Sequence, residues 1–274
     1  MEREQLDQTG MVNIMERYGL QKRDVLPVSE AGQRMDAALE KLRHVGTIKP
    51  SRLGRLIFGL DLTGSREPSL QRARIATAAM FDTIKAVGAV AVKLIYFRGQ
   101  RECKAGEWQI DPGIVSRSML TLSCKTGETQ IALLLRWALT EKRKLIRTGE
   151  AGPACISGVV YIGDHSEDKP EELLEVATEL GKQSMPLFVF HEISDDDARS
   201  LQARPVFERM AQLSGGVYVE FKPDSGAVLK ELLSSVAAFS VGGAEGVEQM
   251  ALPATSEARQ LRGRLLLGSG VRKH

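Results

Sequence analysis

The sequence is poor in cysteine, in long apolar runs and in excess charge, and each shortage excludes a class of protein. Its 274 residues include three cysteines, too few and too scattered to predict a disulfide framework or a zinc ribbon. No apolar run approaches the roughly 18 residues needed to cross a membrane. The charged N-terminus also lacks an apolar secretion segment. These shortages predict a cytoplasmic protein with no membrane partner.

The charge pattern argues against nucleic-acid binding. Lysine and arginine total 37 and aspartate and glutamate total 35, so that the formal net charge is only +2. No sustained basic stripe with interleaved aromatic residues is present. An apolar fraction of 43% is enough for a full core, so we predict an ordered protein without a nucleic-acid partner.

Short apolar runs alternate with helical patterns between about residues 54 and 240. Near-continuous apolar runs of this kind are typical of strands buried on both faces of a parallel sheet. The alternation predicts an α/β fold with a Rossmann-like, doubly wound and mostly parallel sheet. Residues 99–113 break the alternation and predict one antiparallel edge strand. The predicted strands are residues 56–60, 90–97, 159–162, 187–190 and 217–221.

The chain divides into three predicted parts. Residues 1–50 are expected to form a helical N-terminal extension, and residues 51–241 the α/β domain. The glycine-rich stretch 242–246 indicates a linker, so residues 242–274 are expected to be a linker and C-terminal tail. Within that tail, residues 256–267 predict a short helix that docks, frays or binds a partner.

Oxygen-bearing side chains gather at the predicted end of the first strand. Asp61, Thr63 and Ser65 are two residues apart and share one face of an extended segment. Asp164 follows the strand at 159–162, which is expected to lie beside the first strand where the strand order reverses and ligands bind. Hard oxygen ligands suit Mg²⁺, Mn²⁺ or Ca²⁺. The pattern therefore predicts a cation site at this edge of the sheet.

A third segment opens the next helix, where Thr126 or Thr129 offers a further hydroxyl or caps the helix. Together the three segments resemble the metal-ion-dependent adhesion site of the von Willebrand factor type A (VWA) family. That family has Asp-x-Ser-x-Ser, then a distant threonine, then a distant aspartate. Thr63 stands where serine is usual, and Glu128 where glycine is frequent. The resemblance favours Thr129 over Thr126 and implies one divalent cation, with hydroxyl ligands from Thr63, Ser65 and Thr129 and carboxylates from Asp61 and Asp164.

The resemblance implies a protein-interaction module and no enzymatic activity. Neutral hydroxyl ligands would leave Mg²⁺ (or Mn²⁺ or Ca²⁺) with excess positive charge, so the site would bind an Asp or Glu carboxylate of a partner protein. Intracellular VWA proteins resemble adaptors for larger machines, including ATPase complexes. The expected partner is therefore a protein in an assembly of this kind.

Other interpretations use the same crevice. A metal-dependent hydrolase or phosphatase would need a base to activate water, for which Glu67 and Glu128 are candidates. A haloacid-dehalogenase-like phosphatase would lack its general acid, because Thr63 stands in that place. A phosphate-binding loop is excluded because Ser65 stands where lysine belongs. A VWA-like scaffold without an ion, in which Asp61 caps the following helix, also fits the motif.

The segment after Asp164 is rich in polar residues. His165, Glu167 and Asp168 predict a solvated loop that leads into a helix near Pro170. His165 as an additional cation ligand is the minor alternative.

Overall fold

Apolar side chains on both faces of the central strands build a six-stranded sheet with helices on each side. The computed structural model describes residues 53–64, 71, 75–77, 89–100, 102–149, 156–194, 196–222 and 225–268. The strand order is β3-β2-β1-β4-β5-β6. Only β2 and β3 pair in antiparallel fashion, which confirms the predicted α/β sheet with one antiparallel edge strand. The strands are β1 (Leu53–Asp61), β2 (Ala89–Arg98), β3 (Glu102–Ala105), β4 (Gly158–Gly163), β5 (Leu187–Glu192) and β6 (Tyr218–Phe221).

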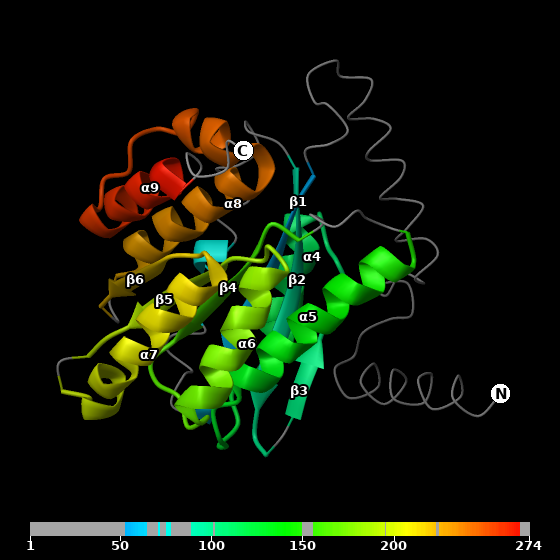
Figure 1. Ribbon diagram of the computed structural model, residues 1–274, viewed down its shortest axis with the longest axis vertical. Coiled ribbons are helices and arrows are strands. Elements are labelled where there is room, and N and C mark those ends of the chain that lie inside the picture. The colour runs from blue at the N-terminus through cyan, green and yellow to red at the C-terminus, as the bar shows by residue number, and fades with distance from the viewer. Residues whose placement is uncertain are drawn as a thin grey trace. The chain divides into compact units, whose positions relative to one another are not determined.

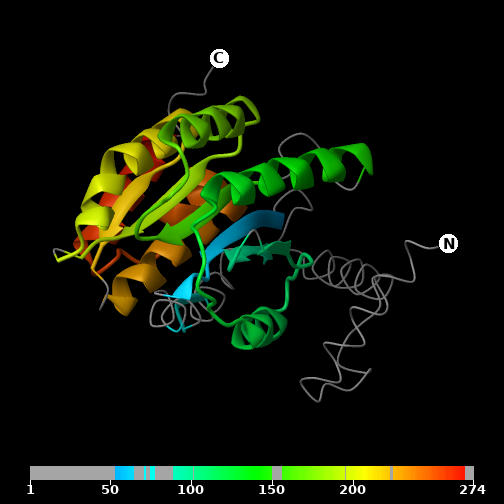
Figure 2. The ribbon, with the colours of Figure 1, turned by 90° about the horizontal axis from the view of Figure 1, so that it is seen from below.

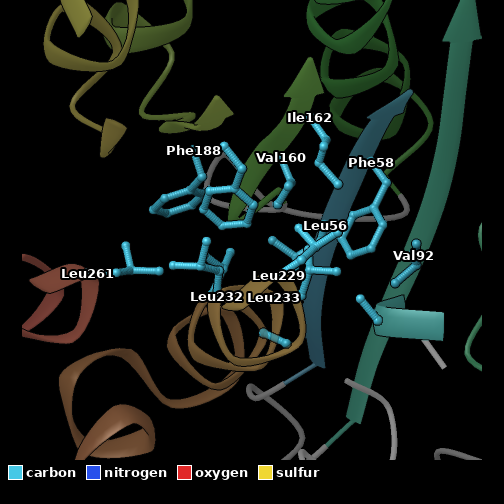
Figure 3. Close-up of a cluster of buried hydrophobic side chains, with 14 of the residues drawn as sticks. Leu56, Phe58, Val92, Val160, Ile162, Phe188, Leu229, Leu232, Leu233 and Leu261 are labelled. Atoms are coloured by element: carbon cyan, nitrogen blue, oxygen red, sulfur yellow. The ribbon is translucent and has the colours of Figure 1, made fainter. Parts of the chain in front are cut away.

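Two groups of helices cover the two faces of the sheet (Figure 1, Figure 2). Alternate residues of each strand point to opposite faces, so each face has its own core. Figure 3 shows one of them, in which leucines of α8 pack beneath β1, β4 and β5. That face is covered by α4 (Pro112–Thr121), α8 (Gly226–Glu248) and α9 (Ser256–Gly268), and the other by α5 (Ile131–Arg147), α6 (Pro170–Lys182) and α7 (Ala198–Ser214).

The strand order reverses between β1 and β4. After β1 the chain builds β2 and β3 on one side and then crosses to β4 on the other side. In the pairing of β1 with β4, Leu60 lies opposite Ile162, so the carboxyl ends of both strands reach the same level. The predicted neighbours are thus confirmed, and the crevice expected at such a reversal lies beyond Asp61 and Gly163.

The C-terminal segment differs from the predicted linker and tail. Residues 242–246 lie within α8, which bends at Gly243, where φ is 60° and ψ is −141°. A positive φ favours glycine, so the glycine that suggested a linker serves a kink between two packed helical segments. The predicted helix is present as α9, and its Ala258, Leu261 and Leu265 are buried in the core. The last described part of the chain is therefore an integral layer of the domain.

α8 is long and apolar enough to cross a membrane by length and composition. More than half of its most apolar part is buried inside the domain, as expected for a core helix. The predicted N-terminal extension, residues 1–50, lies outside the described residues.

Candidate metal centre

The carboxyl end of β1 brings two of the predicted ligands into direct contact. Oδ1 of Asp61 accepts hydrogen bonds from the Thr63 amide at 2.9 Å and from its hydroxyl at 2.7 Å. These bonds fold the chain back immediately after the strand, as Asx turns do. Asp61 and Thr63 are only 5% and 4% exposed. A carboxylate and a hydroxyl are therefore held together in a buried position at the edge of the sheet.

The segment after α4 runs alongside this turn. Leu62 accepts a hydrogen bond from the Lys125 amide at 2.9 Å, and Thr63 forms an isolated bridge with Lys125. Thr126 lies against Gly64, where a Cβ atom would come within 3.2 Å of its hydroxyl. Thr129 is buried, with 3% exposure, two residues before α5 begins. Thr126 therefore lies beside the turn that follows β1, Thr129 lies just before α5, and both remain candidate ligands.

Asp164 follows β4 and forms a compact pair with the next residue. Its Oδ1 accepts a hydrogen bond from the His165 amide at 2.8 Å. The same oxygen lies 2.8 Å from Nδ1 of the His165 ring. This hydrogen bond raises the pKa of His165, although burial opposes the change. Because His165 is only 6% exposed, the prediction of a fully solvated loop is wrong at this residue.

Glu167 and Asp168 also serve a role other than the one predicted. Glu167 accepts a hydrogen bond from the Thr129 amide at 2.5 Å. Oδ2 of Asp168 accepts from the amides of Ile131 at 2.6 Å and Ala132 at 3.2 Å, at the start of α5. Burial raises the pKa of Asp168, and these amide bonds oppose the shift. The two carboxylates join the loop of Thr129 to the loop of Asp164, while the helix expected near Pro170 is present as α6.

One residue missed by the sequence interpretation adds a second group of metal-ligand type. Asp164, His165 and Asp197 each offer one ligand atom, and these atoms lie within 4.8 Å of one another. Asp197 caps α7 by accepting from the Arg199 amide at 3.1 Å. Its position before a helix was the only signal in the sequence, and that signal indicates a cap.

The predicted ligands come from three segments. Asp61 and Thr63 form a hydrogen bond, Asp164 lies one position beyond the end of β4, and Thr129 is joined to the loop of Asp164 through Glu167. Ser65 lies outside the described residues. A set of carboxylate and hydroxyl oxygens fits a hard divalent cation.

Comparison with known proteins was informative only at the level of structure. No protein-family model matches the sequence, and no curated protein matches it either. The pilus adhesin SpaC from Lactobacillus rhamnosus GG is similar, with a TM-score of 0.53 and 10% identity over 70% of this chain and 31% of the adhesin. A mutant of the PilB minor pilin from Streptococcus sanguinis has a TM-score of 0.50 and 9% identity, with 70% and 62% covered. The SpRpn10 VWA domain has a TM-score of 0.47 and 12% identity, with 68% and 94% covered.

The strand order, the single antiparallel edge strand and the helices on both faces agree with the expected architecture. The protein has a VWA fold. Its candidate metal centre occupies the carboxyl edge of the VWA sheet, at the switch between β1 and β4 where this class of fold binds ligands.

Proposed function

We propose that this VWA domain is a divalent-cation-dependent protein-interaction module. The observation that carries the proposal is the buried contact between Asp61 and Thr63 at the end of β1. Carboxylate and hydroxyl oxygens are the ligands that hard divalent cations prefer. Asp164 and Thr129 would add oxygens from the loop after β4 and from the segment before α5, which Glu167 joins to each other.

The oxygen-rich donor set supports Mg²⁺, with Mn²⁺ and Ca²⁺ as alternatives. The group of Asp164, His165 and Asp197 supports a second placement of the ion, because an imidazole nitrogen suits a transition metal better than Mg²⁺. The two placements share Asp164 and differ in the other ligands. Asp61→Ala would weaken ion binding only if the ion occupies the first placement. Asp197→Ala would weaken it only if the ion occupies the second.

A cation held largely by neutral hydroxyls keeps positive charge that an outside anion can neutralise. The proposed partner is therefore a protein that presents an Asp or Glu carboxylate. We place this module in the cytoplasm as an adaptor within a multi-protein assembly, with an ATPase complex as one candidate. The domain would then act by recognition, without catalysis.

The test is calorimetric titration of Mg²⁺, Mn²⁺ and Ca²⁺ into the intact protein. A pull-down with and without EDTA, repeated with an acidic peptide as competitor, tests the partner. Asp61→Ala and Asp164→Ala are expected to lose cation binding and cation-dependent capture while remaining folded. Glu175→Ala removes an exposed carboxylate on α6 and is the matched control. Cation binding by Asp61→Ala equal to that of wild type would contradict the placement at Asp61, and equal binding by Asp164→Ala would contradict both placements.

The metal-dependent hydrolase or phosphatase interpretation makes a different prediction. It requires turnover of phosphate esters or carboxylic esters when Mg²⁺ or Mn²⁺ is added, and loss of that turnover in Asp61→Ala. Turnover with these properties would replace the interaction module as the assigned function. An ion-free scaffold would instead bind its partner equally well in EDTA.

A further inference from the structure

A chain of polar contacts runs from the surface beside α7 to the backbone of Asp164. His191, at the end of β5, is fully buried, with Nε2 2.7 Å from the Asp164 carbonyl oxygen and Nδ1 2.7 Å from the Tyr218 hydroxyl. The Tyr218 hydroxyl also lies 2.8 Å from Oε1 of Glu220. Glu220 in turn pairs with Arg204 on α7, with 2.7 Å between Nε and Oε1.

The chemistry of the carbonyl fixes the orientation of the histidine. A carbonyl oxygen only accepts, so Nε2 must carry a proton. Nδ1 of the neutral ring is then an acceptor, and the one Tyr218 hydroxyl proton is donated either to Nδ1 or to Glu220. The ring is also held by edge-to-face packing on Phe207, with centroids 4.8 Å apart, and on Tyr218, with centroids 5.7 Å apart. A buried ring fixed on both sides has little freedom to release Asp164.

His191 supplies a hydrogen-bond donor at the point where β4 ends. Beyond Gly163 the strand pairing with β5 stops, and the Asp164 carbonyl accepts from the ring there. His191 satisfies the carbonyl of the residue whose carboxylate is a candidate cation ligand. The same contact therefore fixes the backbone from which that carboxylate projects.

We propose that His191 is a positioning residue of the cation site, which it serves by holding the Asp164 backbone, with Tyr218 and Glu220 fixing the ring from behind. This inference rests on the proposed cation binding. Outer-shell partners of metal ligands set the orientation of those ligands, and their removal typically weakens metal binding about 10- to 100-fold.

The experiment is titration of Mn²⁺ into the intact protein, combined with thermal unfolding in EDTA. His191→Leu removes the donor and is expected to weaken Mn²⁺ binding about 10-fold or more. His191→Gln places an amide N–H where Nε2 lies and is expected to recover most of the affinity. Phe188→Leu is the matched control, because it loosens the core on the opposite face of the same strand, and its affinity should match wild type.

The outcomes separate this inference from the proposed function. Failure of the wild-type protein to bind Mn²⁺ would refute the cation site and this inference with it. Normal affinity in a folded His191→Leu protein would refute the positioning role alone, as would equal losses in the Gln and Leu variants. If His191→Leu does not fold, Tyr218→Phe decides the matter. Weaker Mn²⁺ binding by Tyr218→Phe would support the role of Tyr218 in fixing the His191 ring, and unchanged binding would overturn it.

Discussion

The polar anchor at the start of α5 yields the sharpest test of how the two loops of the site are joined. The residue that caps α5, Gln130, makes no side-chain cap bond. Asp168 takes that role from another loop, with Oδ2 accepting from the amides of Ile131 and Ala132. Replacing Asp168 by alanine would remove this acceptor from both amides. The nearer amide in the sequence, that of Ala132, lies 36 residues before Asp168.

The size of the effect follows from two losses and one opposing contribution. Loss of a cap typically costs about 1 kcal/mol, and loss of a negative charge beside a helix N-terminus costs about 0.5 kcal/mol more. Burial raises the pKa of Asp168, which means that its negative charge is held at some cost. Asp168→Ala should therefore lower the free energy of unfolding by about 1–1.5 kcal/mol, whereas Asp168→Asn, which keeps an acceptor oxygen, should stay close to wild type.

Urea unfolding at neutral pH measures both variants, with Glu175→Ala as the control for a carboxylate that anchors nothing. Because the folded-state pKa of Asp168 is raised, wild type gains stability relative to Asp168→Asn as the pH falls through that pKa. Equal losses in the alanine and asparagine variants would refute the cap argument. So would an alanine variant indistinguishable from wild type.

Two further charge clusters give predictions of their own. Partial burial alone would raise the pKa of Glu102, but hydrogen bonds from Arg98, Lys125 and Lys104 lower it to about 2. The stability it contributes is present above the unfolded value of 4.5 and is lost as the pH falls toward 2. With solvent screening, Glu102→Gln should cost about 1 kcal/mol at pH 7 and nothing in strong acid, as measured by unfolding at both pH values. Lys93 and Glu141 form a buried ion pair at 3.0 Å. Lys93→Met should cost roughly 3 kcal/mol because it leaves a buried charge unpaired, and adding Glu141→Gln should restore at least half of that loss. A double variant no more stable than the single one would contradict this account.

The positions of the strands and the edge that carries the site could be predicted from sequence because they depend on local patterns. The apolar runs of β1 and β4 are buried on both faces, and the first acidic residue stands at the end of β1 and directly after β4. The strand order then places the ends of these two strands side by side without any knowledge of side-chain contacts. For the same reason the antiparallel β3 was predictable from a glycine-containing break.

The contacts that fix the site were not predictable, because they join segments far apart in the sequence. Glu167 and Asp168 precede α6 and read as residues of its start, yet their carboxylates bind amides 36 to 38 residues earlier. His191 lies near the end of the apolar strand β5. No sequence periodicity distinguishes a histidine that positions another residue from one that is simply part of the core. Gly243 shows the converse error. The glycine-rich stretch around it was interpreted as a linker, whereas Gly243 lies inside α8, where its positive φ favours glycine.

These long-range contacts bear on how strongly the site would bind an ion. Ligands on mobile loops must be ordered at binding, and the entropy of ordering weakens affinity. Here Thr63 orients the Asp61 carboxylate, His191 holds the Asp164 backbone and Glu167 fixes the amide of Thr129, all through protein contacts alone. A cation bound as proposed would therefore meet loops that protein contacts already hold, and it would spend little of its binding energy on ordering them.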